Sequence, residues 1–153
     1  MLNFLQVFSR LKKLPAYQNK KESDYSSQVF VQRFFPAAGG APTAFDARPF
    51  PIGAIVLGIT ASAFVPGAAA TGQSERNRQL FAIDFAYQGG DAIVLDGPVQ
   101  ADALLGGGEE NIFPAKEMII KATQSLQCRV ANLTTGALTV DVAYHCVVDR
   151  SAA

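Results

Sequence analysis

Tryptophan is absent from the 153-residue chain, and histidine occurs once, as His145. One histidine cannot supply the histidine-rich metal set of a cupin, and lectin sites usually use tryptophan or tyrosine platforms, of which tryptophan is missing. The chain has no G-x-S-x-G elbow, so a hydrolase triad of Ser74, Asp84 and His145 has no support. The glycines at 106–108 are not followed by the Lys-Ser/Thr of a phosphate-binding loop. We therefore predict a protein that is not an enzyme and holds no cofactor.

Cysteine is nearly as scarce, and Cys128 and Cys146 are the only two. Alternation along the C-terminal strands places both on one apolar face and His145 on the opposite face. Zinc needs four convergent ligands, so we predict two buried structural thiols and no metal site. In the hairpin predicted below, Cys146 lies roughly 13 Å along its strand from the position opposite Cys128. That separation is too long for a disulfide.

The N-terminal stretch MLNFLQVF lacks the features of a secretory signal. Asn3 and Gln6 interrupt its apolar residues, and its positive charges follow the apolar stretch instead of preceding it. We therefore expect a protein that is made and used without export, with reduced cysteines.

No charged residue occurs between Pro49 and Ser74, a run long enough for a transmembrane helix at about 20 residues. Proline and glycine interrupt the run, however, and its large apolar residues mostly alternate with small ones. The apolar parity holds Ile55, Leu57, Ile59, Ala61, Ala63 and Val65. Because side chains at i and i+2 share a face of a sheet, the run predicts one long half-buried strand instead of a membrane span. This strand should end at the turn Pro66-Gly67.

Alternation continues along the rest of the chain. Residues 81–87 predict a half-buried strand that ends at a Gly-Gly turn, and residues 92–99 and 117–121 predict two shorter strands. No helix of usual length is evident in this part. Residues 51–153 are therefore predicted to form an all-β domain, either a β-sandwich or a single jelly roll.

The C-terminal segment gives the clearest local pattern. SLQCRVANL and ALTVDVAYHCVV flank the short loop TTG, with Gly136 suited to a left-handed position. This arrangement predicts a hairpin in which Leu133 faces Ala137 and Cys128 lies opposite Val142.

Residues 1–50 follow a different pattern. Apolar residues recur every three positions from Leu2 to Leu11, which fits a short amphipathic helix or docking segment ending before Pro15. QVFVQRFF indicates a brief strand, and residues 36–51 are rich in proline, glycine and alanine. We predict an extended N-terminal arm, without which the strands of the body should still fold.

Charge divides the chain in the same way. Residues 1–50 carry seven Lys/Arg against three acidic residues, a net +4, and the remainder carries six against ten, a net −4. This split favours contact of the arm with a neighbouring acidic body over nucleic-acid binding. The predicted interface anchors of the arm are Phe4, Phe8, Phe30, Phe34, Phe35, Phe45 and Phe50.

The segment FPAKEMIIKATQSLQCRVANLTTGALTVDVAYHCVV, together with QLFAIDFAYQ, resembles bacteriophage virion proteins of the small β-sandwich type, over residues 50–149. The resemblance implies a minor capsid, decoration or head-vertex component that is made in the host cytoplasm and located in the virion. Its partners would be other virion proteins and further copies of itself, with no sequence-specific nucleic-acid contact. The alternative is a ligand- or carbohydrate-binding β-sandwich module.

Overall fold

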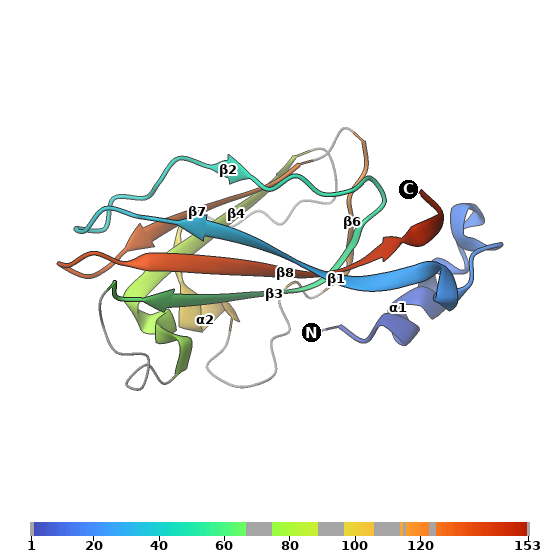
Figure 1. Ribbon diagram of the computed structural model, residues 1–153, viewed down its shortest axis with the longest axis horizontal. Coiled ribbons are helices and arrows are strands. Elements are labelled where there is room, and N and C mark those ends of the chain that lie inside the picture. The colour runs from blue at the N-terminus through green and yellow to red at the C-terminus, as the bar shows by residue number, and fades with distance from the viewer. Residues whose placement is uncertain are drawn as a thin grey trace.

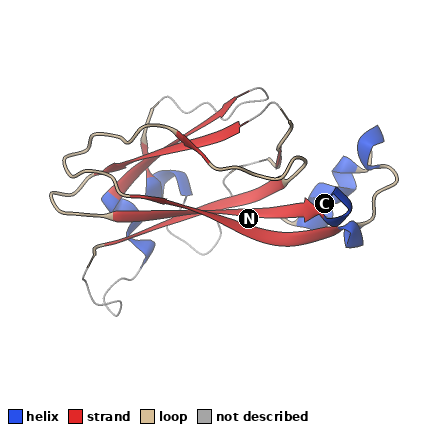
Figure 2. Ribbon diagram, turned by 45° about the horizontal axis from the view of Figure 1, so that its top comes forward, coloured by secondary structure: helices blue, strands red, loops and turns tan. Residues whose placement is uncertain are grey.

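The computed structural model describes residues 2–66, 75–88, 97–105, 114, 116–122 and 125–152. The strands are β1 (Tyr25–Phe34), β2 (Asp46–Ala47), β3 (Ile55–Phe64), β4 (Phe81–Gln88), β5 (Val99–Gln100), β6 (Met118–Ile119), β7 (Ser125–Asn132) and β8 (Thr139–Asp149). The α-helices are α1 (Phe4–Leu11) and α2 (Ala101–Leu105), and the 3-10 turns are η1 (Pro15–Tyr17), η2 (Glu22–Asp24), η4 (Glu75–Leu80) and η5 (Arg150–Ala152). The strands form the body, with the short helices at its periphery (Figure 2).

Two antiparallel sheets of four strands pack against each other as a β-sandwich (Figure 1). Sheet A has the strand order β1-β8-β3-β6, and sheet B has the order β2-β7-β4-β5. The first strand pairs with the last, β2 with β7, β3 with β6, and β4 with β5. The predicted β-sandwich is confirmed, with short helices added to it, and β3, β4, β6, β7 and β8 lie where the alternation predicted strands. The predicted Gly-Gly turn after β4 and most of the predicted strand at 92–99 lie outside the described residues.

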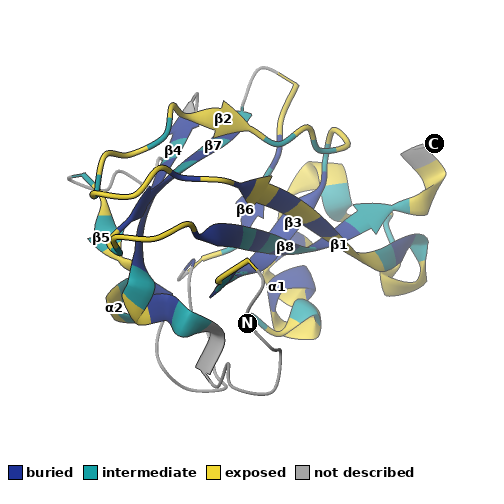
Figure 3. Ribbon diagram, turned by 60° about the vertical axis from the view of Figure 1, so that its left-hand side comes forward, coloured by how far each residue is buried: buried dark blue, intermediate teal, exposed yellow. Residues whose placement is uncertain are grey.

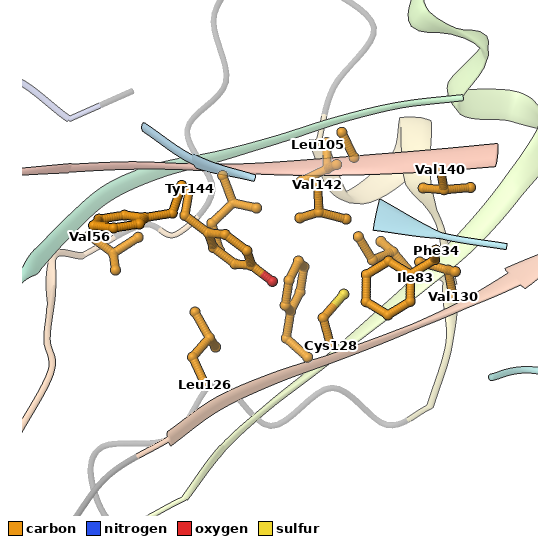
Figure 4. Close-up of a cluster of buried hydrophobic side chains, with 14 of the residues drawn as sticks. Phe34, Val56, Ile83, Leu105, Leu126, Cys128, Val130, Val140, Val142 and Tyr144 are labelled. Atoms are coloured by element: carbon orange, nitrogen blue, oxygen red, sulfur yellow. The ribbon is translucent and has the colours of Figure 1, made fainter. Parts of the chain in front are cut away.

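The main core lies between the sheets (Figure 4). Phe81, Ile83 and Phe85 of sheet B and Val140, Val142 and Tyr144 of sheet A are at most 2% exposed. Each set alternates along its strand, so each sheet contributes one apolar face. The large residues Ile55, Leu57 and Ile59 of the alternating run are also buried, whereas Val65, beyond the end of β3, is 43% exposed.

The predicted hairpin between β7 and β8 is wrong. β7 pairs with β2 and β4, whereas β8 pairs with β1 and β3, so residues 133–138 connect the two sheets. The buried Asn132 holds this connection, because its Nδ2 donates to the Gly136 carbonyl at 2.8 Å and its Oδ1 accepts from the Thr134 amide at 2.8 Å. Local alternation fits a hairpin and a crossover equally well, since both leave one apolar face on each strand.

The predicted extended arm is also wrong. The short helix and the brief strand predicted within it are confirmed as α1 and β1, but β1 is the edge strand of sheet A, joined to β8 by ten consecutive residue pairs. The amide of Leu5 is capped by the Asn3 side chain at 2.9 Å. The N-terminal segment therefore belongs to the fold, because β8 offers it a strand edge and sheet A offers it an apolar face.

β3 differs from the prediction in one respect. Its pairing with β8 shifts between Val56 and Gly58, which marks a bulge. Ile55 and Leu57 therefore pack in a second core under α1, whereas Ile59 packs in the main core. Ile55 and Leu57 thus lie on the opposite face of β3 from Ile59, Ala61 and Ala63, since a bulge inserts one residue into the alternation.

Candidate interaction surface

The outer face of sheet A, which points away from sheet B, has a covered half and a bare half. On the covered half, Val7, Phe8 and Leu11 of α1 are buried against sheet residues. The sheet residues of this second core are Tyr25, Ile55, Leu57 and Val147. The rings of Phe4 and Phe8 each lie with their centroids 5.6 Å from that of Tyr25. Apolar residues on both sides of the contact explain why α1 docks here.

Polar bonds fix the same end of the molecule. The Leu2 amide donates to the Leu57 carbonyl, within the β3 bulge, at 2.9 Å. Arg10 of α1 pairs with Glu117 at 2.7 Å, and Lys20 pairs with Asp149 at 2.7 Å. The hydrogen bond from Lys20 and those from Ser151 lower the pKa of Asp149 to about 2. Residues 2–20, which include α1, are therefore attached to β3 through Leu2 and to the C-terminal end of β8 through Lys20.

The bare half lies further along the same strands. The register aligns Val29 with His145, Val31 with Ala143, and Arg33 with Asp141. Val29 and Val31 are each 53% exposed, because no helix in the described part of the chain packs on them. The burial colours show exposed and buried residues alternating along β1 (Figure 3).

Polar side chains on this half satisfy one another. Arg33 donates to both carboxylate oxygens of Asp141, at 2.7 and 2.9 Å, and its guanidinium lies 5.4 Å from the Phe64 ring centroid. Thr60 Oγ1 and His145 Nε2 are 3.0 Å apart. The charged groups of this half are thus already paired within sheet A, and its two valines are its exposed apolar groups.

β1 is also an open edge of sheet A. Among the described residues, no backbone hydrogen bond joins residues 26–34 to any segment other than β8. Phe35, one residue beyond the strand, is 75% exposed. We call Ser27, Gln28, Val29, Val31, Arg33 and Phe35 the β1 edge surface.

The inner side of this edge is closed by a buried polar network. Tyr144 points its hydroxyl into the core and donates to Gln32 Oε1 at 2.8 Å (Figure 4). Gln32 Nε2 in turn donates to the carbonyl and the carboxylate of Asp46, both at 3.1 Å. This network ties β1 to β2 across the two sheets, so β1 is held in place while its outer edge stays accessible.

The seven predicted anchors differ in how far they are buried. Phe8, Phe30 and Phe34 are at most 8% exposed within the chain's own cores, so the expectation that they are exposed is wrong. Phe4 packs against the second core and Phe50 against the main core, where its ring contacts those of Phe30 and Tyr144. Phe35 and Phe45 remain exposed.

Phe35 is open to solvent, and Phe45 is 38% exposed. The Phe45 ring lies 4.4 Å from the guanidinium of Arg129, which pairs with the buried Asp84 at 2.8 Å. Val29 and Val31 were not among the predicted anchors. The signal for them was present in QVFVQRFF, where the valines occupy the parity opposite to Phe30.

The cysteines are free and buried in the main core. Burial raises the pKa of Cys146 to about 12 and raises that of Cys128 further, so both stay as neutral thiols near pH 7. His145 lies on the opposite face of sheet A, as the alternation predicted. The predicted 13 Å offset between the thiols rested on the incorrect hairpin and does not apply.

The described part of the chain holds neither a cluster of metal-binding side chains nor a helix that could span a membrane. No three His, Cys, Asp or Glu side chains there converge as a metal site would require. No helix in the same residues has the length and apolar character needed to cross a membrane. Comparison with family models, curated proteins and solved structures finds no match to this chain.

Proposed function

We propose that this protein is a non-enzymatic structural component of a virion, built on a single jelly roll. The observation that carries the proposal is the pairing of β1 with β8, β2 with β7, β3 with β6, and β4 with β5. These four pairs make one long antiparallel hairpin that is rolled into two sheets, which is the jelly-roll arrangement. Jelly rolls of eight strands form viral capsid and lectin domains.

Fold alone does not assign a function, so the surface has to decide between these two uses. A lectin binds its ligand at polar and aromatic side chains that are free to contact a sugar. On the bare half of sheet A the charged groups Arg33 and Asp141 are paired with each other, and the exposed apolar groups are valines on an open strand edge. Exposed apolar groups beside an unpaired edge favour contact with another protein chain.

The resemblance of the C-terminal strands to small virion β-sandwich proteins points the same way. On this proposal the protein is a minor capsid, decoration or head-vertex component that acts through buried area instead of chemistry. Its partners are further copies of itself and other virion proteins. This proposal does not use an extended arm to reach neighbouring subunits, because residues 4–11 and 25–34 are built into the sandwich.

Mass measurement tests the proposal most directly. Purified protein should form a discrete oligomer whose population rises with concentration, as measured by light scattering after gel filtration. An antibody against the recombinant protein should label intact particles banded in a density gradient from the producing culture. A monomer at all concentrations would contradict self-assembly, and particles without the protein would contradict a virion location.

A further inference from the structure

The β1 edge lacks the devices that normally prevent strands from pairing between molecules. Natural edge strands are protected by charges, prolines, bulges or short length. β1 has ten residues in unbroken register with β8, and it contains no proline. Its only charged residue is Arg33, which is paired with Asp141 of its own sheet. Such an edge is available for strand addition.

We infer that β1 pairs antiparallel with β1 of a second copy, so that two copies of sheet A become one continuous eight-stranded sheet. This inference rests on the proposed function and names the partner. In a symmetric antiparallel pair, the outward-facing residues of one β1 lie beside the outward-facing residues of the other β1. Residues 26–32 carry no charge, so two copies can approach along this stretch without like-charge repulsion.

The side chains select the position of the two-fold axis. With the axis at Phe30, Val29 of one copy lies opposite Val31 of the second copy, and the reverse contact occurs across the axis. Directly opposite side chains lie with Cβ atoms about 5 Å apart, so all four valines meet. An axis moved to Val29 would place Val31 opposite Ser27, and an axis moved to Val31 would place Val29 opposite Arg33. The Phe30 axis therefore buries the most apolar surface.

The ends of the strand support the same axis. Arg33 lies opposite Ser27 of the second copy, so no like charges face each other. Phe35 lies opposite Tyr25 of the second copy, whose ring already packs against Phe4 and Phe8 at 5.6 Å between centroids. The most exposed aromatic ring of the described residues thus reaches the aromatic cluster beneath α1.

Lysine substitutions test the contact. The double variant Val29→Lys/Val31→Lys should raise the dimer dissociation constant on the order of 100-fold, because two buried apolar groups per copy are replaced by charges that face each other. Sedimentation equilibrium measures the constant, and circular dichroism checks that the variant is folded. The matched control is Leu133→Lys, since Leu133 is 50% exposed on the connection between β7 and β8.

The outcomes separate this inference from the proposed function. An oligomer in the wild type and the control, with a folded monomeric double variant, supports both. An oligomer that persists in the double variant overturns β1 pairing and leaves the assembly role standing. A monomeric wild type overturns both, and loss of assembly in Leu133→Lys would show that the effect is not specific to β1.

Cysteine cross-linking tests the register independently of stability. A mixture of Val29→Cys protein and Val31→Cys protein should form a mixed disulfide under mild oxidation, because directly opposite positions lie within disulfide reach. Each variant alone should stay uncross-linked, since identical positions are then diagonal neighbours about 7–8 Å apart. The native cysteines are buried and do not compete. Cross-linking of either variant alone would overturn the Phe30 axis. Absence of cross-linking in the mixture would overturn it as well.

Discussion

The two halves of the outer face of sheet A are built from the same three strands, β1, β8 and β3, yet only one is covered. Under α1 the sheet presents Tyr25, Ile55, Leu57 and Val147, and the helix buries Val7, Phe8 and Leu11 on them. On the other half two exposed valines stand among polar side chains that pair with each other. A helix of the same chain therefore covers the wide apolar surface, whereas the two valines at the strand edge stay exposed to solvent.

The bulge in β3 produces this difference. It turns Ile55 and Leu57 outward at the α1 end and leaves Thr60 and Ser62 outward at the other end. Without the shift, Ile55, Leu57 and Ile59 would share one face, so Ile55 and Leu57 could not pack under α1 while Ile59 packs in the main core. Bulges commonly redirect side chains in this way.

Removing both N-terminal elements should have the largest effect. A chain beginning at Asp46 loses α1 and β1, and Phe30 and Phe34 then leave the main core while Tyr144 loses its bond to Gln32. We expect no cooperative unfolding transition in a urea titration followed by fluorescence. A chain beginning at Pro15 removes α1 alone and should stay β-rich with lower stability. A wild-type transition for the Asp46 chain would show that β1 is dispensable to the fold.

Weakening the main core should come next. Phe85→Ala removes a ring that is 2% exposed between the sheets and should cost about 3–5 kcal/mol of unfolding free energy. The urea midpoint measures the loss. Val65→Ala is the control, because Val65 is 43% exposed and should change stability by less than about 0.5 kcal/mol. Equal losses for the two variants would contradict the placement of the core.

Weakening the α1 core should cost less. Leu11→Ala removes a side chain that is 3% exposed, and we expect a loss of about 2 kcal/mol, near the low end for leucine because a peripheral helix can relax. Hydrogen exchange should show lost protection in α1 with β4 and β7 unchanged. Leu14→Ala is the matched control, since Leu14 is 47% exposed. Uniform loss of protection would mean that α1 and the sandwich unfold as one unit.

The smallest expected effect concerns Asp149. Its pKa falls from an ordinary 3.8 to about 2 in the folded protein, so its stabilising contribution is present above the ordinary value and is lost as pH falls through this interval. Asp149→Asn should lower the melting temperature slightly at neutral pH, because the bonds with Lys20 and Ser151 weaken. The difference from wild type should shrink on acidification toward pH 2. A difference that is independent of pH would assign the effect to packing.

Alternation by itself determined much of the sandwich. It placed the strands at β3, β4, β7 and β8, identified the buried residues of the main core, and put His145 opposite the cysteines. These are local consequences of a period of two along the chain, so no knowledge of strand partners is needed. The proline and glycine residues in the uncharged run argued against a membrane-spanning helix, and its alternation predicted the strand that became β3.

Strand partners and the fate of the N-terminal segment were decided by tertiary structure. The alternation of β7 fits two arrangements, one in which β8 is its hairpin partner and one in which β8 lies in the opposing sheet. In the folded protein, Leu126, Cys128 and Val130 face the opposing sheet. QVFVQRFF gave no sign that β8, more than a hundred residues later, would pair with it, and the bulge between Val56 and Gly58 has no signature in the alternation. Pairing and docking depend on contacts between residues distant in sequence, whose free energy is set by the packed sheets and not by local pattern.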